Sequence, residues 1–280
     1  MASLKVPTQQ QHSVAATYFA PDVLSRHSVI INPATGVKQK YYRNFADYLA
    51  STGFHVYTYD YQGIGESRTE NLKSVNASMT SWAEIDLAAM VDFVSKQHPE
   101  NKLSMIGHSL GGQLIGFTRA TLPLYRIVIV ASQTPYWKHY HGSMGFKIWS
   151  LWHLMIPILT PLFGYFPSKL LGLFEDLPKN AAYQWSRWGK NRNYLFDEFP
   201  EKKKIFSSLN QETLVYSFTD DPYATKEAVD DLLHFYSNLR IEHHHIHPSQ
   251  LKLKSFGHFS FFKKDYREYF WKNVVEWLNR

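Results

Sequence analysis

The sequence has 280 residues, and its 30 Lys and Arg residues against 24 Asp and Glu residues give a formal net charge of +6. With 44% hydrophobic and 16% aromatic residues, the composition excludes an intrinsically disordered chain and allows one large folded domain. The chain contains no cysteine, which excludes disulfide bonds, thiolate metal ligands and cysteine nucleophiles and favours a reducing, cytoplasmic location.

The charged residues are dispersed, without the pattern of a targeting segment or of a nucleic-acid-binding surface. Residues 1–11 are polar and lack the apolar run and cleavage site of a secretory signal. The densest basic cluster, Lys202 to Lys204, has no interleaved aromatic residues of the kind that bind nucleic acids. We therefore expect this cluster to be solvated surface, and we predict no nucleic-acid partner.

Strand-like and helix-like segments alternate through the first half of the chain. Short apolar or β-branched runs predict strands at residues 28–32, 54–59, 103–106 and 127–130. Helical spacing of apolar residues predicts helices at residues 41–50 and 110–120, and a capping-box pattern of Ser81 and Glu84 predicts the start of another. Repeated β-α-β units of this kind predict an α/β fold with a mostly parallel sheet that helices cover on both faces.

The pattern changes after residue 134, where the chain becomes rich in aromatic residues, is interrupted by prolines and shows no clear strand. The α/β pattern then returns as one predicted strand and two predicted helices, at residues 214–218, 226–236 and 261–278. We therefore expect residues 135–206 to form a helical cap that is inserted into an α/β core, which comprises residues 1–134 and 207–280.

One segment of the expected cap is long and apolar enough to cross a membrane. Residues 148–166 include no formally charged side chain over 19 positions. The segment contains Pro157 and Pro161 and has no charge asymmetry between its flanks, which disfavours a spanning helix. We predict instead that it folds over an apolar pocket or contacts a lipid surface.

Residues 107–111, Gly-His-Ser-Leu-Gly, match the pattern G-x-S-x-G and lie between a predicted strand and a predicted helix. A serine on such a tight turn exposes its hydroxyl above the sheet, and the flanking glycines let strand and helix approach without Cβ clashes. The same turn directs the Leu110 N–H toward a negative charge that develops beside the serine. This placement predicts Ser109 as a nucleophile.

A serine nucleophile needs a base to accept its proton and a third group to orient that base. Asp220 and Asp221 follow a predicted strand, at the carboxyl end where the catalytic groups of α/β sheets collect. His258 lies on a predicted turn before the last helix. The chain therefore offers serine, aspartate and histidine in that order, which differs from the order in the two other common serine-protease folds.

These motifs resemble those of the α/β hydrolases over essentially the whole chain. The resemblance is carried by five segments, namely Asn32-Pro33-Ala34-Thr35-Gly36, Asp60-Tyr61-Gln62-Gly63-Ile64-Gly65-Glu66-Ser67, residues 107–112, Asp221-Pro222 and Gly257-His258. More narrowly, the sequence is similar to bacterial predicted hydrolases related to serine-aminopeptidase and monoacylglycerol-lipase-like branches. The resemblance implies Ser109 as nucleophile, His258 as base and Asp221 as the residue that orients the base.

The choice of acid depends on the register of one strand. The family's strand usually ends in Gly-x-x-Asp-Pro, and matching that ending puts Asp221 at the acid position, with Phe218 in place of glycine. Asp220 remains the alternative. Comparison of the two Asp→Asn variants would decide between them.

The first loop of the resemblance departs from the family, because Asn32-Pro33 stands where His-Gly is commoner. Proline has no N–H to donate to an oxyanion. The resemblance then implies the backbone N–H groups of Ala34 and Leu110 as the oxyanion donors, with Thr35 as the alternative to Ala34. A second interpretation is that Pro33 only fixes a turn.

Three other patterns are interpreted as structural. Residues 63–68 resemble a dinucleotide-binding fingerprint, but Arg68 replaces the third glycine that close helix packing needs. The histidines between residues 243 and 247 would point to alternate faces of a strand and accompany no carboxylate motif, so no metal site is predicted. Trp185 and Trp188 are predicted to pack within the cap rather than to stack on a ligand.

We therefore expect a serine hydrolase that cleaves an ester, or less readily an amide, through an acyl-enzyme and without a cofactor. The aromatic cap and the low charge favour a small-molecule substrate with an apolar acyl or aromatic portion. An acyltransferase would use the same three residues while excluding water. A binding module that keeps the pocket without the chemistry is a third hypothesis. The sequence leaves the oligomeric state open.

Overall fold

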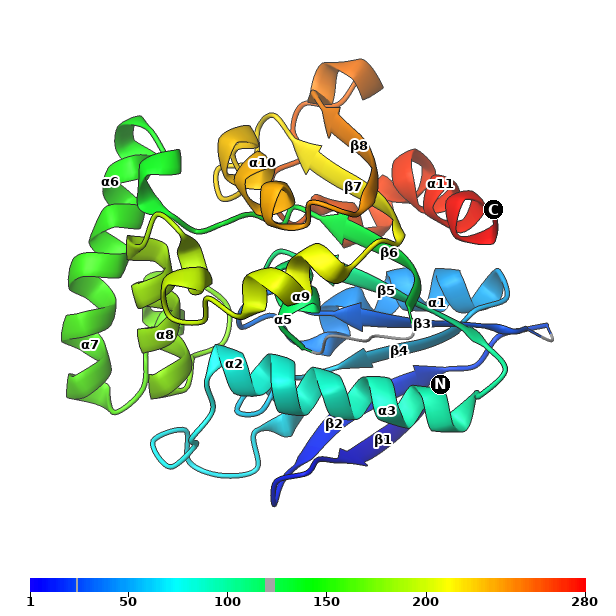
Figure 1. The fold of residues 1–280 in the computed structure, drawn as a ribbon, viewed down its shortest axis with the longest axis horizontal. Coiled ribbons are helices and arrows are strands. Elements are labelled where there is room, and N and C mark those ends of the chain that lie inside the picture. Colours follow the sequence, from blue (N-terminus) through cyan, green and yellow to red (C-terminus); the bar gives the residue numbers. More distant parts are fainter. Residues whose placement is uncertain (24, 119–123) are drawn as a thin grey trace.

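The computed structural model describes residues 1–23, 25–118 and 124–280. The described strands form one sheet in the order β1-β2-β4-β3-β5-β6-β7-β8 (Figure 1). Their bounds are β1 Ala2–Pro7, β2 Ser13–Phe19, β3 His27–Asn32, β4 His55–Tyr59, β5 Lys102–His108, β6 Leu124–Val130, β7 Glu212–Phe218 and β8 Arg240–Ile246. Strands β3 to β8 run parallel to one another, whereas β1 and β2 form an antiparallel hairpin in which β2 pairs with β4. The predicted mostly parallel α/β sheet is confirmed.

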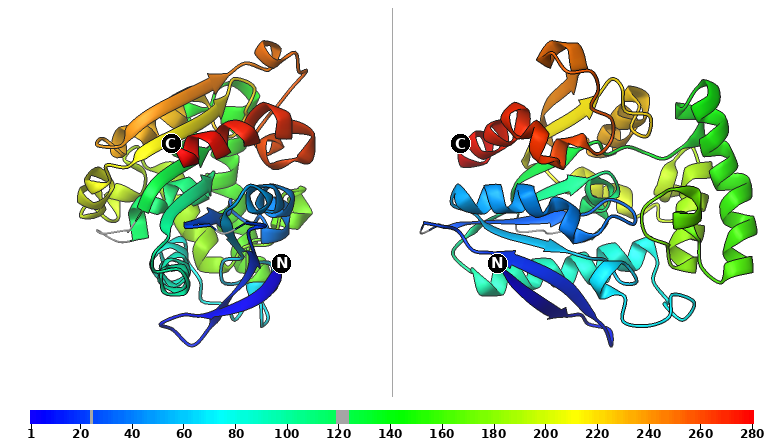
Figure 2. Two further views of the ribbon diagram at one scale, coloured as in Figure 1. Left: turned by 90° about the vertical axis from the view of Figure 1, so that its right-hand side faces the viewer. Right: turned by 180° about the vertical axis from the view of Figure 1, so that it is seen from behind.

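Helices cover both faces of this sheet, as Figures 1 and 2 show. The helices are α1 Arg43–Ser51, α2 Met79–Ser81, α3 Ala88–Gln97, α4 Leu110–Gln113, α5 Ile115–Thr118, α6 Gly142–Ser150, α7 Ile156–Phe163, α8 Lys179–Lys190, α9 Lys202–Ser208, α10 Lys226–Phe235 and α11 Arg267–Asn279. Successive side chains of a strand point to opposite faces, so Ile30 packs in one hydrophobic cluster with α3 while Val29 and Ile31 pack in another with α1 and α11. This double burial explains the continuous apolar runs of the central strands.

Three predicted helix boundaries were wrong or incomplete. Ser78, rather than Ser81, caps the second helix: its Oγ accepts from the Ser81 N–H at 3.1 Å, and the Ser81 Oγ accepts from the Ser78 N–H at 2.8 Å. The predicted helix at 110–120 divides into α4 and α5, and its last two residues lie outside the described residues. The last helix begins at Arg267 because the preceding residues form two 3₁₀ turns.

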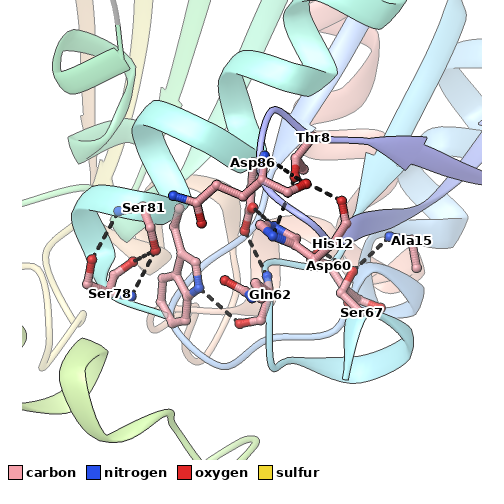
Figure 3. Close-up of polar contacts among 11 residues, drawn as sticks. Thr8, His12, Ala15, Asp60, Gln62, Ser67, Ser78, Ser81 and Asp86 are labelled. Carbon is pink, nitrogen blue, oxygen red and sulfur yellow. Dashed lines mark hydrogen bonds and ion pairs between the residues drawn. The ribbon is translucent and has the colours of Figure 1, made fainter. Parts of the chain in front are cut away.

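The N-terminal hairpin, which the sequence analysis left without an assigned structure, is attached through a buried carboxylate (Figure 3). His12 Nε2 lies 2.7 Å from Asp86 Oδ1, and the Gln62 N–H donates to Asp86 Oδ2 at 2.8 Å. Asp86 belongs to a π-helical turn, Trp82–Leu87, that joins α2 to α3. Burial raises the pKa of this carboxyl, and the His12 hydrogen bond opposes that shift. The pair therefore fastens β1 and β2 to the helix that covers the sheet.

Between β6 and β7, α6 to α8 lie beyond the carboxyl ends of the parallel strands, whereas α9, which the predicted cap boundary at residue 206 divides, packs against α5 and α10 (Figure 1). We call residues 135–200, which include α6 to α8, the helical insertion. Its α6 and α7 join through a π-helical turn into one helix, Gly142–Phe163, which by length and composition is apolar enough to cross a membrane. The inner side of this helix is fixed by Trp152, whose Nε1–H donates to the Pro135 carbonyl at 3.0 Å. Ser186 of α8 donates to the Trp152 carbonyl at 2.7 Å.

Candidate active site

Ser109 stands on a tight turn between β5 and α4. Its φ of +52° lies in the left-handed region that non-glycine residues rarely adopt, and such strain persists only where the surroundings impose it. A Cβ at Gly107 would lie 2.5 Å from the Gly112 Cα, and a Cβ at Gly111 would collide with the Asn32 carbonyl. The glycines of the motif therefore allow the strand, the turn and the helix to pack closely enough to hold the serine in this conformation.

His258 is oriented by Asp221. The His258 Nδ1 lies 2.7 Å from Asp221 Oδ2, and the other carboxylate oxygen accepts from the N–H groups of Tyr223 at 2.8 Å and Ala224 at 3.0 Å. Both partners are buried. With Nδ1–H donating to the carboxylate, Nε2 is the nitrogen that is free to accept a proton. Ser109 and His258 line the same cavity without a direct hydrogen bond, which is common in ligand-free sites.

Asp220, the neighbouring carboxylate, does not contact the imidazole. Its oxygens accept from the N–H of Phe256 at 2.7 Å and from the N–H of Gly257 at 3.2 Å. Gly257 has a φ of +62°, as a sharp bend before His258 requires. The two consecutive carboxylates therefore have separate contacts: Asp221 meets the histidine side chain, and Asp220 holds the loop that carries it.

A buried hydrogen-bonded chain, which the sequence analysis missed, joins the loops of the site. The Ala34 N–H donates to the Tyr42 hydroxyl at 2.9 Å, and that hydroxyl lies 2.9 Å from His108 Nδ1. His108 Nε2 lies 3.0 Å from the backbone carbonyl of His258. Burial, followed by the nearby His258, holds the pKa of His108 well below its ordinary value. His108 is therefore neutral, with its proton on Nε2 toward the carbonyl and Nδ1 accepting from Tyr42.

The predicted oxyanion donors differ in their availability. Leu110 is the first residue of α4, so its N–H has no acceptor within the helix. The Ala34 N–H is already occupied by the Tyr42 hydroxyl. Among the described residues, no acceptor pairs with the N–H of Thr35, the alternative donor, and Thr35 lines the cavity. The structure therefore favours the N–H of Thr35 over that of Ala34 as the second oxyanion donor.

The cavity beside Ser109 has a volume of about 350 Å³ and lies between the sheet and the helical insertion. Most of its lining from the insertion is apolar, with contributions from Ile148, Leu151, Trp152, Leu177 and Trp185. Trp185 packs edge-on against Trp152, with ring centroids 4.7 Å apart, and also faces the cavity. Trp188 is fully buried, as its predicted packing role requires, and its Nε1–H donates to Glu198 at 3.1 Å.

The histidines of β8 hydrogen bond to neighbouring side chains. His243 and His245 share one face and both hydrogen bond to the Ser217 hydroxyl, at 2.8 and 2.7 Å. His244 points to the other face and lies 3.0 Å from Glu242. In the part of the chain that the structure describes, no group of three or more His, Asp or Glu side chains is arranged to hold a metal ion.

The chain matches a family model and curated relatives over part of its length. The family model described as serine aminopeptidase, S33, matches residues 25–152. An uncharacterized 31.7 kDa protein from the traX-finO intergenic region of Escherichia coli is 29% identical over 111 residues. That match covers 38% of this chain and 37% of the relative, so it spans little more than a third of each.

Solved structures match the chain over nearly its whole length. A thermostable carboxyl esterase from Bacillus coagulans, in complex with glycerol, has a TM-score of 0.65 at 13% identity and covers 99% of this chain and 97% of its own. A monoacylglycerol lipase from Paleococcus ferrophilus has a TM-score of 0.61 at 16% identity, with 95% and 98% covered. Est1E from Butyrivibrio proteoclasticus, with bound ferulic acid, has a TM-score of 0.62 at 15% identity, with 99% and 98% covered. At such identities the similarity establishes the fold.

Proposed function

We propose that this chain, an α/β hydrolase by fold, is a serine hydrolase that cleaves carboxylic esters through an acyl-enzyme. One observation carries the proposal. Ser109, on its positive-φ turn, shares a cavity with His258, and His258 is held by a 2.7 Å hydrogen bond to a buried Asp221. A nucleophile, a base and an orienting carboxylate are what acyl transfer from an unactivated ester needs.

The proposed reaction begins with attack of the Ser109 hydroxyl oxygen on the ester carbonyl carbon, while His258 Nε2 accepts the hydroxyl proton. The Asp221 carboxylate stabilises the resulting imidazolium, and the N–H groups of Leu110 and Thr35 donate to the oxyanion. The imidazolium then returns the proton to the departing alkoxide, which leaves as an alcohol. Water, deprotonated by His258, attacks the acyl-enzyme, and the acid is released with the Ser109 hydroxyl restored.

The proposed substrate is a small ester with an apolar acyl or aromatic portion. The aliphatic and indole side chains that the helical insertion contributes to the cavity would bury such a group. A volume of about 350 Å³ matches a small molecule rather than a folded partner. The structural neighbours described as a carboxyl esterase and as a monoacylglycerol lipase, and the one that binds ferulic acid, agree with this class.

Covalent labelling tests the chemistry. A fluorophosphonate probe should label the wild type and fail to label Ser109→Ala. Turnover of p-nitrophenyl esters of graded chain length should fall by at least about 10³-fold in that variant. A wild type that neither reacts with the probe nor hydrolyses any ester of the series would instead indicate a binding module. Transfer of the acyl group to an added alcohol in preference to water would indicate an acyltransferase.

A further inference from the structure

The outer face of the long helix Gly142–Phe163 is apolar and uncovered. Its inner residues, Ile148, Trp152, Ile156 and Thr160, are buried at four-residue intervals. Residues on the opposite face are exposed at multiples of the same interval, namely Phe146, Leu154, Ile158 and Leu162. Phe146 is 68% exposed and Leu162 is 74% exposed. Figures 1 and 2 show this helix along the outer edge of the molecule, with no other element beyond it.

The exposed apolar side chains of the protein concentrate at this edge. Of the eleven large apolar residues that are exposed in the described chain, seven lie between residues 142 and 174. They include Leu170 and Phe174, which follow the long helix. A soluble protein rarely leaves such a contiguous patch without a partner. We call these seven residues the outer patch: Phe146, Leu154, Ile158, Leu162, Phe163, Leu170 and Phe174.

One residue of the outer patch also lines the cavity of the candidate active site. Phe174 is 39% exposed and also lines the catalytic cavity. Its ring lies 4.6 Å, between centroids, from Phe259, the residue after His258. The same long helix turns its other side to the cavity through Ile148 and Leu151. Phe174 is therefore common to the outer patch and the cavity, and the long helix contributes side chains to both.

The part of the chain that carries the outer patch is mostly positively charged. Residues 136–190 contain six Lys and Arg residues and two Asp and Glu residues, a net charge of +4 out of +6 for the whole chain. Lys147 is exposed directly beside Phe146. Glu175, one of the two acidic residues, is already paired with Lys38 at 2.9 Å and Lys169 at 3.0 Å. The patch therefore combines exposed apolar side chains with a positive surround, which suits an anionic lipid surface.

Crossing the bilayer would require the long helix to leave the protein's own core. Trp152 and Ile156 are buried, and the hydrogen bonds of Trp152 to Pro135 and Ser186 tie the helix to the rest of the insertion. A spanning helix would lose these contacts. A second copy of the chain is a poorer occupant, because a twofold contact would set the same positive surface against itself.

We propose that the outer patch docks on the surface of a phospholipid bilayer that contains anionic lipids. The helix Gly142–Phe163 lies in the plane of the interface, its exposed side chains enter the boundary between headgroups and acyl chains, and the surrounding Lys and Arg residues contact the headgroups. This docking does not depend on the proposed esterase activity, because it needs only the surface.

Vesicle co-flotation of the purified full chain tests the proposal. Wild type should float with vesicles of phosphatidylcholine and phosphatidylglycerol, and less with pure phosphatidylcholine. Ile158→Glu/Leu162→Glu should reduce binding at least about tenfold, because two apolar anchors become charges. The matched control is Val23→Glu, which alters a 62% exposed apolar residue that precedes β3, at the opposite ends of the parallel strands. The control should bind as wild type does.

The other outcomes would overturn the proposal. Wild type that stays unbound with both vesicle types, or equal loss in the control and the double variant, would remove the lipid surface as a partner. A dimer in light scattering that Ile158→Glu/Leu162→Glu converts to monomer, without vesicle binding, would assign the patch to a second copy. Resistance of the bound protein to extraction at alkaline pH would indicate a spanning helix. Circular dichroism of both variants checks that they are folded.

Discussion

At the carboxyl edge of the sheet, the buried side chains of His258 and Asp221 are paired, whereas the outer face of the helical insertion leaves apolar side chains in water. His258 and Asp221 are about as buried as core residues, and each has its hydrogen-bond partners. Leu162 on the insertion is 74% exposed. Burial makes the polar contacts at the edge strong and fixed, because an unpaired polar group there would be costly. The exposed face gains stability only when something covers it.

The two regions also differ in how they are held. Two segments of the helical insertion, and Thr134 just before it, converge on Asp231 of α10. Asp231 Oδ2 accepts from Thr134 at 2.7 Å and lies 3.1 Å from His139 Nε2, and Asp231 Oδ1 accepts from Arg192 at 2.7 Å. His139 stands near the start of the insertion and Arg192 follows α8. Asp231 is thus one of several polar attachments of the insertion, alongside the Thr80 N–H, which donates to Gln184 at 2.9 Å, and the Tyr140 hydroxyl, which donates to the Tyr223 carbonyl at 2.8 Å.

The substitution with the largest expected effect disrupts the proposed active site and leaves the helical insertion intact. Asp221→Asn should lower kcat by about 10³- to 10⁴-fold, because an amide no longer stabilises the imidazolium and can favour the wrong tautomer of His258. Asp220→Asn should lower kcat by less than about tenfold, since the Asn carbonyl can still accept from Phe256 or Gly257. Steady-state kinetics with a soluble p-nitrophenyl ester measures both. A greater loss of kcat in Asp220→Asn than in Asp221→Asn would instead assign the orientation of His258 to Asp220.

A substitution with a smaller expected effect weakens the attachment of the helical insertion to α10. Asp231→Asn should lower the free energy of unfolding by about 1–3 kcal/mol, because it weakens the part-buried contacts with His139 and Thr134 and the exposed contact with Arg192. Urea denaturation measures this loss, and hydrogen exchange should localise it to the insertion. Asp230→Asn on the same helix is the matched control. The Asp230 side chain is 49% exposed and pairs with Lys226, so its loss should change stability by less than about 0.5 kcal/mol.

The attachment through Asp231 should also depend on pH in a defined window. Burial by itself lowers the pKa of His139, but hydrogen bonds to Asp231 and Glu227 raise it above 6.5 overall. The contribution of protonated His139 to folding stability is therefore full below pH 6.5 and is lost as the pH rises through the raised pKa. Burial by itself raises the pKa of Asp231, but its hydrogen-bond partners lower it to about 2. The contribution of ionised Asp231 to folding stability is therefore full above pH 3.8 and is lost as the pH falls toward 2. The stability difference between wild type and Asp231→Asn should be greatest between pH 3.8 and 6.5. A difference that does not vary with pH would contradict an ionic attachment.

The same contrast explains what the sequence could predict. The central strands and the turn at Ser109 follow from local patterns, because a buried parallel strand needs an apolar run and a strained serine turn needs flanking glycines. The Asp221 contact with His258 joins residues 37 positions apart; the order of motifs indicated an aspartate–histidine pair, and the match to the family's strand ending selected Asp221 over Asp220. These features are specified by residues that have few alternatives.

Other contacts could not be predicted because their residues have many alternatives. Nothing in the local sequence of Tyr42 indicates that its hydroxyl pairs with His108, 66 positions away. The pairing of His12 with Asp86 likewise depends on how the hairpin meets a helix that is distant in sequence. Ser78 replaced Ser81 as the cap because both serines fit the local pattern, and the packing of the helix decides between them. Buried polar pairs are set by the tertiary fold rather than by periodicity.

The substitution with the smallest expected effect on activity tests which backbone N–H is the second oxyanion donor of the proposed active site. Tyr42→Phe removes the hydroxyl that accepts from the Ala34 N–H and donates to His108 Nδ1, so the loop beside the oxyanion loses one anchor. If the Thr35 N–H is the second oxyanion donor, kcat should fall about threefold to tenfold, and KM should change little. If the Ala34 N–H is the donor, the substitution releases it from a competing acceptor, and kcat should rise. Measurement of kcat and KM on one soluble ester, with the melting temperature as a control for folding, distinguishes these outcomes because only the second predicts a faster variant that is also less stable.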